Sequence, residues 1–454
     1  MKTLQFTLLI ILCSGCLKKE RLNEPPVSNF RTPTTLDDLQ MLLEDNTVNN
    51  TSPEMGELSA DNYYLSPLSA LLATTIEYNT YTWSKDIFMG MGGIADWMDP
   101  YKQVYNSNVI LKTLKGITRT TANSVQFNTV KGSALFLRGY AFYNLAQLFI
   151  LPYDEQTAAS DPGLPLRLSD NVLEVSVRST IKETYERILA DITEAENLLN
   201  NEVDINHPNR PSKPAAMALL SRTYLSMGKY DSAGIYADRC LNLYNKLLDY
   251  NTLSTNSNYP FRTANPEILF YNEIPKSNIL RALIAKGTIV DSTLYTSYST
   301  DDLRHSLYFV LTSELMPTIR SSYTGTTLLF SGLATDEVYL TRAECLARAG
   351  DVAAALHDLN TLLQNRYKKD AFTPINASNA GNALQIILQE RRKELAFRNT
   401  RWTDIRRLNK EGKGIHLKRM VNNIKYELPP NDKRYALPFP PDVIAMSGMP
   451  QNER

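Results

Sequence analysis

One stretch near the C-terminus, residues 383–410, combines an apolar helical stripe with an unusual density of charge. It reads ALQIILQERRKELAFRNTRWTDIRRLNK. Apolar residues recur at helical spacing in its first half, which predicts a helix with one face in the core. Asn399 is expected to end this helix, because Asn tolerates the left-handed conformation that closes helices. A second short helix, residues 402–408, is expected to fold back on the first.

The charged side chains of this stretch predict a partly buried network of ion pairs. An arginine can grip a carboxylate through two parallel hydrogen bonds, so arginines suit ion pairs that are removed from water. The residues expected in this structural ion-pair cluster are Glu390, Arg391, Glu394, Arg401, Asp404 and Arg406.

A pair of catalytic carboxylates is the functional alternative for the same residues: Glu390 with either Glu394 or Asp404. A general acid needs a raised pKa. Each of these carboxylates has arginine neighbours, and nearby cations lower the pKa of a carboxyl group. We therefore favour the structural role and predict no catalytic residue.

The same stretch carries a family resemblance. Residues 390–407, ERRKELAFRNTRWTDIRR, resemble the ERR-x-EL-x-F-x-x-x-RW-x-D-x-RR signature of the SusD/RagB-like nutrient-binding outer-membrane lipoproteins of Bacteroidota. Residues 301–304 resemble the D-D-L-R of that family, residues 435–441 its L-P-I-P closure, and residues 451–452 its Q-N near the end. The resemblance implies a mainly α-helical, SusD-like fold with scattered tetratricopeptide-like helix pairs, long irregular loops and a minor β component.

Two helix–turn–helix segments in the sequence fit this expectation. Residues 214–244 contain a Gly, Tyr and Ala spacing that resembles a tetratricopeptide repeat, and residues 337–366 form a second copy. The copies are far apart, whereas an adaptor array has tandem repeats about 34 residues long. We expect a helical N-terminal part, residues 34–250, and a C-terminal part, residues 251–454, to form one integrated globular unit.

The N-terminus predicts export rather than a structural element. Residues 1–15 are expected to be a signal peptide, because Lys2 precedes an apolar core too short to span a bilayer. Residues 13–16, Cys-Ser-Gly-Cys, resemble the lipobox of bacterial lipoproteins, which predicts lipid on Cys16; a plain secretory signal is the alternative. The polar residues 16–33 are then a tether. The protein would be lipid-anchored at the outer membrane, facing the cell surface, without crossing the membrane.

Composition excludes several classes of function. The chain has 48 basic and 48 acidic residues, which argues against a nucleic-acid partner. It contains no glycine-rich phosphate loop, no HExxH and no CxxC, and its histidines are scattered. We therefore predict no cofactor and no metal site. Cys240 and Cys345 lie on apolar helical faces, so a disulfide framework is not expected.

Aromatic residues supply the candidate ligand contacts. The stretch 78–105 holds two of the three tryptophans, with glycines between them, which suits a surface for stacking sugars. Within it, Trp97, Tyr101 and Tyr105 step by four and share a helix face, so packing in the core is the alternative. The expected ligand-binding residues are Tyr81, Trp83, Trp97, Tyr295 and Tyr298.

The resemblance supplies the expected role. Such proteins capture a nutrient, often an oligosaccharide, and deliver it to a SusC-like TonB-dependent outer-membrane transporter. Binding of this kind needs stacking and a few hydrogen bonds but no chemistry. A peptide or another non-glycan ligand within the same family is the alternative, and an exported glycoside hydrolase or a repeat-type adaptor are further ones.

Overall fold

The computed structural model describes residues 33–275, 277–284 and 288–454, without the side chains of 282–284. The chain divides into two units, Met1–Thr34 and Thr35–Arg454.

Several expectations fall on the N-terminal segment. The signal peptide, lipid-bearing Cys16 and nearly all of the tether lie outside the described residues, so they stay predictions. The expected boundary at residue 250 also stays a prediction. Within the described ranges, no helix is both long enough and apolar enough to cross a membrane.

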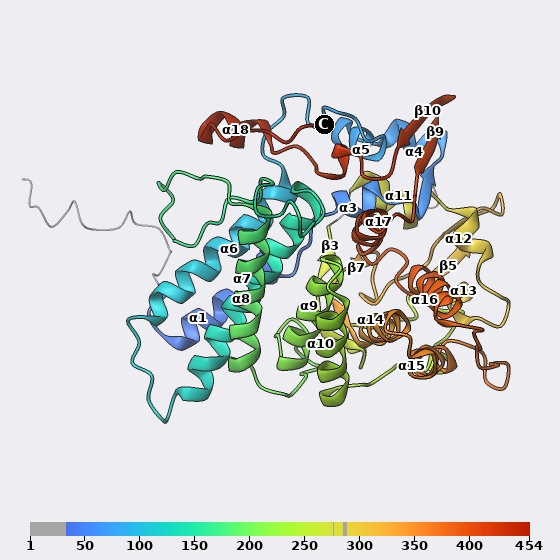
Figure 1. Cartoon of the computed structure of the whole chain (residues 1–454), viewed down its shortest axis with the longest axis horizontal. Helices are drawn as coiled ribbons and strands as arrows, with labels where there is room; N and C mark the ends of the chain where they lie inside the picture. Colours follow the sequence, from blue (N-terminus) through green and yellow to red (C-terminus); the bar gives the residue numbers. More distant parts are fainter. Residues whose placement is uncertain (1–32, 276, 285–287) are drawn as a thin grey trace, which may run out of the picture. The chain divides into compact units, whose positions relative to one another are not determined.

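Three long helices and one shorter helix build the N-terminal part of the second unit (Figure 1). They are α1 (Leu36–Leu43), α6 (Ala95–Leu114), α7 (Ser124–Phe149) and α8 (Ile181–Leu198). Helix α7 is buried at almost every position from Val130 onward, because α1, α6 and α8 all pack against it. Gly139 permits the approach of α8, since a Cβ atom there would lie 2.7 Å from Cγ1 of Ile192. Thr180 starts α8 with the capping box that its sequence indicates.

The two tetratricopeptide-like segments form helix pairs that pack on each other. The pairs are α9 (Lys213–Ser226) with α10 (Tyr230–Leu243), and α14 (Thr335–Arg348) with α15 (Val352–Gln364). Gly228 and Gly350 turn the chain between the members of each pair with φ angles of 70° and 89°, which favour glycine. Helix α10 packs so closely on α14 that a Cβ atom at Gly234 would lie 3.1 Å from Cβ of Cys345.

The charged C-terminal stretch forms α16 (Ala380–Glu394) and α17 (Arg401–Lys410), as its periodicity predicts. Helix α16 ends before Asn399. The chain then turns through Phe397 and Asn399, whose φ angles of 59° and 58° are left-handed. Asn399 is therefore part of the connection between the helices rather than the residue that stops the first one.

The remaining elements are short. The other helices are α2 (Asn46–Asn49), α3 (Met55–Ser59), α4 (Pro67–Leu72), α5 (Thr75–Tyr81), α11 (Asn278–Ile284), α12 (Ser292–Thr296), α13 (Leu303–Tyr308) and α18 (Pro441–Ser447). The strands form antiparallel pairs: β1 (Tyr63–Leu65) with β4 (Thr288–Val290), β2 (Ile268–Phe270) with β8 (Leu333–Ala334), β3 (Glu273–Ile274) with β7 (Leu329–Phe330), β5 (Phe309–Leu311) with β6 (Pro317–Ile319), and β9 (Leu417–Val421) with β10 (Ile424–Leu428).

These elements confirm the expected fold class, which is mainly helical with a minor β component. The largest hydrophobic core lies among α1, α6, α7, α8 and α9. A second core joins several of the strands to α11, α12 and α13.

Candidate functional site

The charged stretch lies in two adjoining buried ion-pair networks. The first, which we call the Glu394 network, comprises Glu267, Asp302, Arg304, Arg366, Glu390, Lys393 and Glu394. Glu394 bridges two arginines, with Arg304 Nη1 at 2.9 Å and Arg366 Nε at 2.7 Å. Both arginine side chains are fully buried. Each charge in this network therefore has an opposite charge in place of water.

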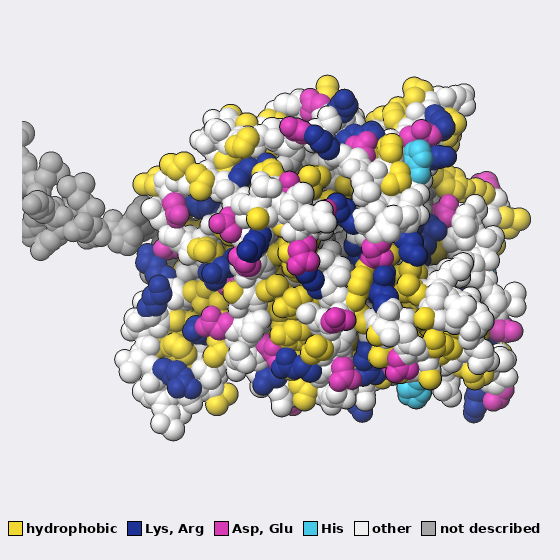
Figure 2. Space-filling view, viewed as in Figure 1, with side chains coloured by type: hydrophobic (Ala, Val, Ile, Leu, Met, Phe, Trp, Pro, Cys, Tyr) yellow, Lys and Arg dark blue, Asp and Glu magenta, His cyan; other side chains and the backbone are white. Residues whose placement is uncertain are grey.

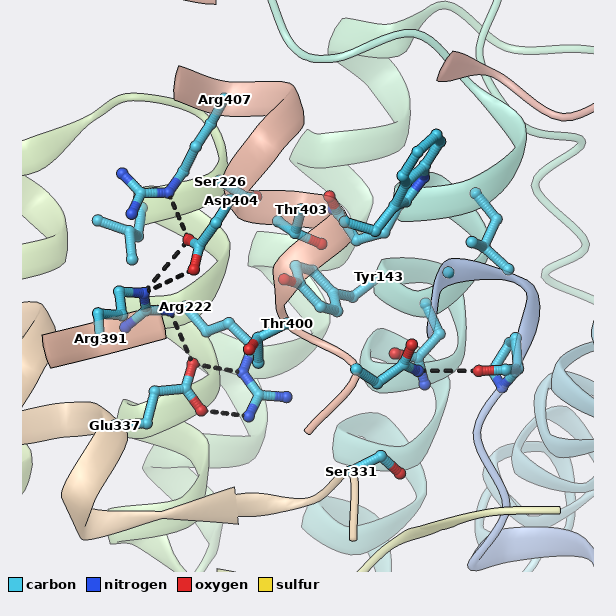
Figure 3. A pocket seen from close by; sticks show the side chains of 18 residues that line it. Tyr143, Arg222, Ser226, Ser331, Glu337, Arg391, Thr400, Thr403, Asp404 and Arg407 are labelled. Carbon is cyan, nitrogen blue, oxygen red and sulfur yellow. Dashed lines mark hydrogen bonds and ion pairs between the residues drawn. The ribbon is translucent and has the colours of Figure 1, made fainter. Parts of the chain in front are cut away.

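The second network, which we call the Asp404 network, joins α14, α16 and α17 (Figure 3). It comprises Arg222, Glu337, Glu344, Arg391, Asp404 and Arg407. Asp404 accepts from Arg391 Nε at 2.9 Å and from Arg407 Nε at 2.8 Å. Burial alone would raise the pKa of Asp404, but the two guanidinium groups hold it below its ordinary value. Asp404 therefore lacks the raised pKa of a general acid.

Two arginines of the stretch have other partners. Arg401 pairs with Asp61, Nε to Oδ1 at 2.6 Å. Burial alone would raise the pKa of Asp61, but Arg401 holds it well below its ordinary value. Arg406 instead donates to the backbone carbonyls of Gln147 and Ile150 at the end of α7. Among the described residues, Arg406 thus anchors α17 to a helix end rather than to a carboxylate.

A cavity in the Asp404 network is too small for a nutrient. It lies between Arg391, Asp404 and Tyr143 and holds about 30 Å³, which is about the volume of one water molecule. Glu390, Glu394 and Asp404 are all buried. Within the described residues, no three or more His, Cys, Asp or Glu side chains form a group that could hold a metal ion.

Tyr81 and Trp83 lie in the core around Arg419. The guanidinium carbon of Arg419 lies 3.7 Å from the ring centroid of Tyr81 and 4.4 Å from that of Trp83. The same guanidinium donates to the backbone carbonyls of Tyr81 and Ala60. Trp83 is only 2% exposed, and its indole Nε1 donates to the carbonyl of Ser59 at 3.0 Å. In this conformation both rings contact protein rather than solvent.

Tyr295 and Tyr298 lie beside the Glu394 network. Tyr298 is buried, and its hydroxyl donates to the carbonyl of Lys393 at 2.8 Å. Tyr295 is partly exposed and packs on His305, with ring centroids 4.7 Å apart. Ligand contact by these two residues, as by Tyr81 and Trp83, stays a prediction. The five aromatic candidates do not converge on one surface.

Trp97 lines a groove large enough for a ligand. It is mostly buried against Phe149 and Phe439, at centroid distances of 5.0 and 4.6 Å. One turn further along α6, Tyr101 donates its hydroxyl to the carbonyl of Pro165 at 2.9 Å. After one more turn Tyr105 is 43% exposed. The aromatic face of α6 therefore emerges from the core into solvent.

We call the hollow above this face the α6–α18 groove. It has a volume of about 460 Å³ and lies between α6, residues 165–176 and the C-terminal segment 443–449. Its walls carry largely exposed aliphatic side chains, and hydrophobic side chains gather where α18 meets the loop before α8 (upper left of Figure 2). The exposed aliphatic residues are Val172, Leu173, Val175 and Met446.

Backbone contacts hold one wall of this groove in place. Arg167 donates to the carbonyls of Glu174 at 2.7 Å and Asn171 at 2.6 Å, so one side chain ties the loop together. Asn108 on α6 donates to the carbonyls of Arg167 and Ser169, both at 3.1 Å. The loop therefore keeps its shape without regular secondary structure.

The opposite wall is held by packing of Val443 and Ile444 against the main core and by the carboxylate of Asp442. Helix α18 has no buried residue, and the Oδ2 atom of Asp442 at its start accepts from the amide of Gly93 at 2.9 Å. A Cβ atom at Gly92 would lie 2.7 Å from the Asp442 carboxylate, so a larger residue there would displace this side chain. Gly92 and Gly93, which lie between the two tryptophans, thus contact the start of α18.

Sequence reasoning missed most of the groove. Asn108, Arg167 and Met446 carry no motif, and their proximity depends on tertiary contacts. One signal was available, since Leu173, Val175 and Val177 alternate with polar residues, which is the pattern of a strand with one apolar face. The structure forms no strand over residues 171–177, and these three side chains are exposed.

Two protein-family models match the chain. The SusD-like model described as "Starch-binding associating with outer membrane" matches residues 18–225, and the model described as "SusD family" matches residues 335–445. Together they span more than half of the chain. No curated protein sequence matches it.

Solved structures share the fold. A SusD superfamily protein from Bacteroides thetaiotaomicron VPI-5482 is 22% identical, with a TM-score of 0.75 over 92% of this chain and 100% of that one. A SusD superfamily protein from Bacteroides vulgatus ATCC 8482 is 20% identical, with a TM-score of 0.73 over 93% and 99%. A SusD-like carbohydrate binding protein from the same strain is 17% identical, with a TM-score of 0.66 over 91% and 97%.

Proposed function

Since the chain belongs to the SusD/RagB family, we propose that it is an outer-membrane lipoprotein that binds an oligosaccharide in the α6–α18 groove. It delivers this nutrient to a SusC-like TonB-dependent transporter. Lipid on Cys16 anchors it at the cell surface, with residues 16–33 as the tether. A SusD-like carbohydrate binding protein with the same fold supports the choice of ligand class.

The observation that carries this proposal is the exposed end of the aromatic face of α6. Tyr105 presents its ring to the groove, with Tyr101 and Trp97 behind it. The C–H face of a sugar ring packs on an aromatic ring, while nearby polar groups fix its orientation.

The protein binds its ligand without transforming it. The carboxylates of the charged stretch are buried and held by arginines, so they do not form an open acid–base pair. Glu267 has a pKa that burial raises to about 7, but this side chain is fully buried and paired with Arg366. Shortened sugar products after incubation with the protein would favour the glycoside hydrolase alternative.

An exposed apolar surface supports a protein partner. Leu68, Leu71 and Leu72 share one face of α4, and Leu71 is 81% exposed. Met420 and Ile424 are exposed on the β9–β10 hairpin. Exposed apolar clusters on soluble surfaces often mark interaction sites. We assign the α4 face to the transporter, and Leu71→Glu is expected to abolish co-purification with a SusC-like protein identified by mass.

The anchor has its own test. Cells that express the chain and are fed a radiolabelled fatty acid should label the protein, and Cys16→Ala should remove the label. Label that survives this substitution would contradict the lipid site. A labelled protein that proteases cannot reach on intact cells would place it inside rather than at the surface.

Calorimetry with oligosaccharides and peptides tests the ligand assignment. Tyr105→Ala is expected to weaken oligosaccharide binding by about tenfold or more, because it removes the exposed stacking surface. The matched control is Tyr259→Ala, since Tyr259 is 42% exposed and lies outside the groove. Peptide binding without sugar binding would move the assignment to a peptide ligand. Equal effects of both substitutions would place the site elsewhere.

A further inference from the structure

The α6–α18 groove continues into a second hollow. Asn108 and Ser169 line both, so the two hollows meet at these residues. The second hollow has a volume of about 750 Å³ and lies between α6, α7 and residues 168–171. We call the two together the joined groove. A ligand longer than one sugar can therefore extend from the aromatic end into the second hollow.

One stripe of α6 forms the floor of the whole joined groove. Its members are Trp97, Tyr101, Tyr105, Asn108, Lys112 and Lys115. The spacings of three and four residues place them on one face of a helix. The stripe is aromatic at its N-terminal end, carries an amide in the middle and is basic at its C-terminal end. From Tyr105 to Lys115 it rises about 15 Å, at about 1.5 Å per residue.

The basic end of the stripe carries two exposed lysines, Lys112 and Lys115, that an anionic ligand can reach. Lys115 is exposed and has no ion-pair partner among the described residues. Lys112 pairs with Asp170 at 2.7 Å, and its side chain is 68% exposed. An exposed ion pair of this kind contributes little stability, so an incoming anion can replace the carboxylate at small cost.

A third lysine belongs to the basic end, whereas the neighbouring Arg138 does not. Lys131 on α7 pairs with Glu194 at 2.6 Å at the rim. Arg138 is not available, because Asp191 and Asn108 hold its guanidinium in the core. Without Arg138, four basic side chains line the joined groove together with three acidic ones, although the chain as a whole is neutral. The excess charge therefore belongs to the groove.

We propose that the joined groove selects an acidic oligosaccharide, with a sugar ring on Tyr105 and carboxylate or sulfate groups at Lys112 and Lys115. This rests on the proposed function, because it assumes that the α6–α18 groove binds sugar. A neutral oligosaccharide fills the same space but leaves the lysines to water. A monosaccharide is too short to reach both ends.

Matched pairs of probes test the charge preference. The full chain, purified in mild detergent, is titrated with oligogalacturonate and its neutral methyl ester, and with a chondroitin sulfate oligosaccharide and its desulfated form. The more acidic member of at least one pair should bind about tenfold more tightly at low salt. Because exposed charges are screened, this preference should shrink as ionic strength rises toward 1 M.

Substitutions on one helix locate the effect. Lys115→Gln should reduce the preference about threefold, and Lys112→Gln combined with it should abolish the preference. The matched control is Lys102→Gln: this lysine is also on α6, is 57% exposed and pairs with Asp99 at 2.8 Å, but lies outside the joined groove. It should leave the preference unchanged.

The outcomes separate the two proposals. If neutral and acidic probes bind equally and Tyr105→Ala still weakens them, the acidic selectivity is wrong and the sugar site stands. If Lys102→Gln reduces the preference as much as Lys115→Gln, the charge effect is not located in the groove, which also overturns the inference. If no oligosaccharide binds, both the acidic selectivity and the proposed function are wrong.

Discussion

In the Glu394 network, two fully buried arginines share one carboxylate, whereas in the joined groove the exposed Lys115 has no partner among the described residues. The aromatic rings differ in the same way. Trp83 packs beside Arg419 in the core, and Tyr105 reaches solvent. Side chains whose ion pairs and hydrogen bonds are complete inside the protein maintain the fold. Surface side chains that lack such partners remain available to a ligand.

The largest expected effect is the loss of a shared carboxylate in the Glu394 network. Glu394→Ala leaves Arg304 and Arg366 buried with one partner fewer each. Removing one member of a buried ion pair typically costs about 3–5 kcal/mol, and here buried guanidinium N–H groups of both arginines lose their acceptor. Urea denaturation followed by circular dichroism measures this loss. A cost below about 1 kcal/mol would mean that the network contributes little to stability.

The next effect compares two aromatic rings directly. Trp83→Ala should lower the free energy of unfolding by about 3 kcal/mol, because it leaves a cavity beside Arg419. Tyr105→Ala should change it by less than about 1 kcal/mol, since the side chain is half exposed. Thermal unfolding of the two variants, with oligosaccharide titrations in parallel, separates the roles. Weaker sugar binding by a stably folded Trp83→Ala protein would support the prediction that Trp83 contacts the ligand.

A buried carboxylate without an ion pair gives a pH-dependent effect. Burial raises the pKa of Glu57 to about 7 from its ordinary value of 4.5, although the amide of Asn399 donates to it. Between these two values the folded state holds a proton that the unfolded state has lost. Stability should therefore fall as pH rises through this window, by about 1.4 kcal/mol per pH unit from this group.

Glu57→Gln isolates this contribution. The variant keeps an acceptor for Asn399 but cannot ionise, so its unfolding free energy should depend less on pH between about 4.5 and 7. Above about pH 7 the unfolding free energies of the two proteins should change with pH at the same rate. An unchanged slope would show that Glu57 is ionised in the folded protein over this pH range.

The smallest expected effect on stability is the loss of an exposed ion pair. Lys182 and Glu186 form an exposed pair on α8 with N and O atoms 3.9 Å apart. Lys182→Ala should change the unfolding free energy by less than about 0.5 kcal/mol. A loss comparable with that of Glu394→Ala would remove the contrast between buried and exposed ion pairs in this protein.

Much of the fold was predictable because its signals are local. The capping box at Thr180, the glycine turns of the two helix pairs and the apolar stripe of α16 each lie within a few residues. The site was predictable only in part. The spacing of Trp97, Tyr101 and Tyr105 indicates a shared face, but not that the face runs from the core into solvent. That outcome depends on which segments cover it.

By itself, the sequence determined the helices, their pairing by small residues and the surplus of arginines near the C-terminus, because these follow from periodicity and composition over short distances. Only the tertiary structure decided which charges pair and where a groove opens. Gly93 meets Asp442 across 349 residues, and Arg406 binds the end of α7 instead of a carboxylate. Such contacts depend on how packed helices bring distant segments together, which no local pattern encodes.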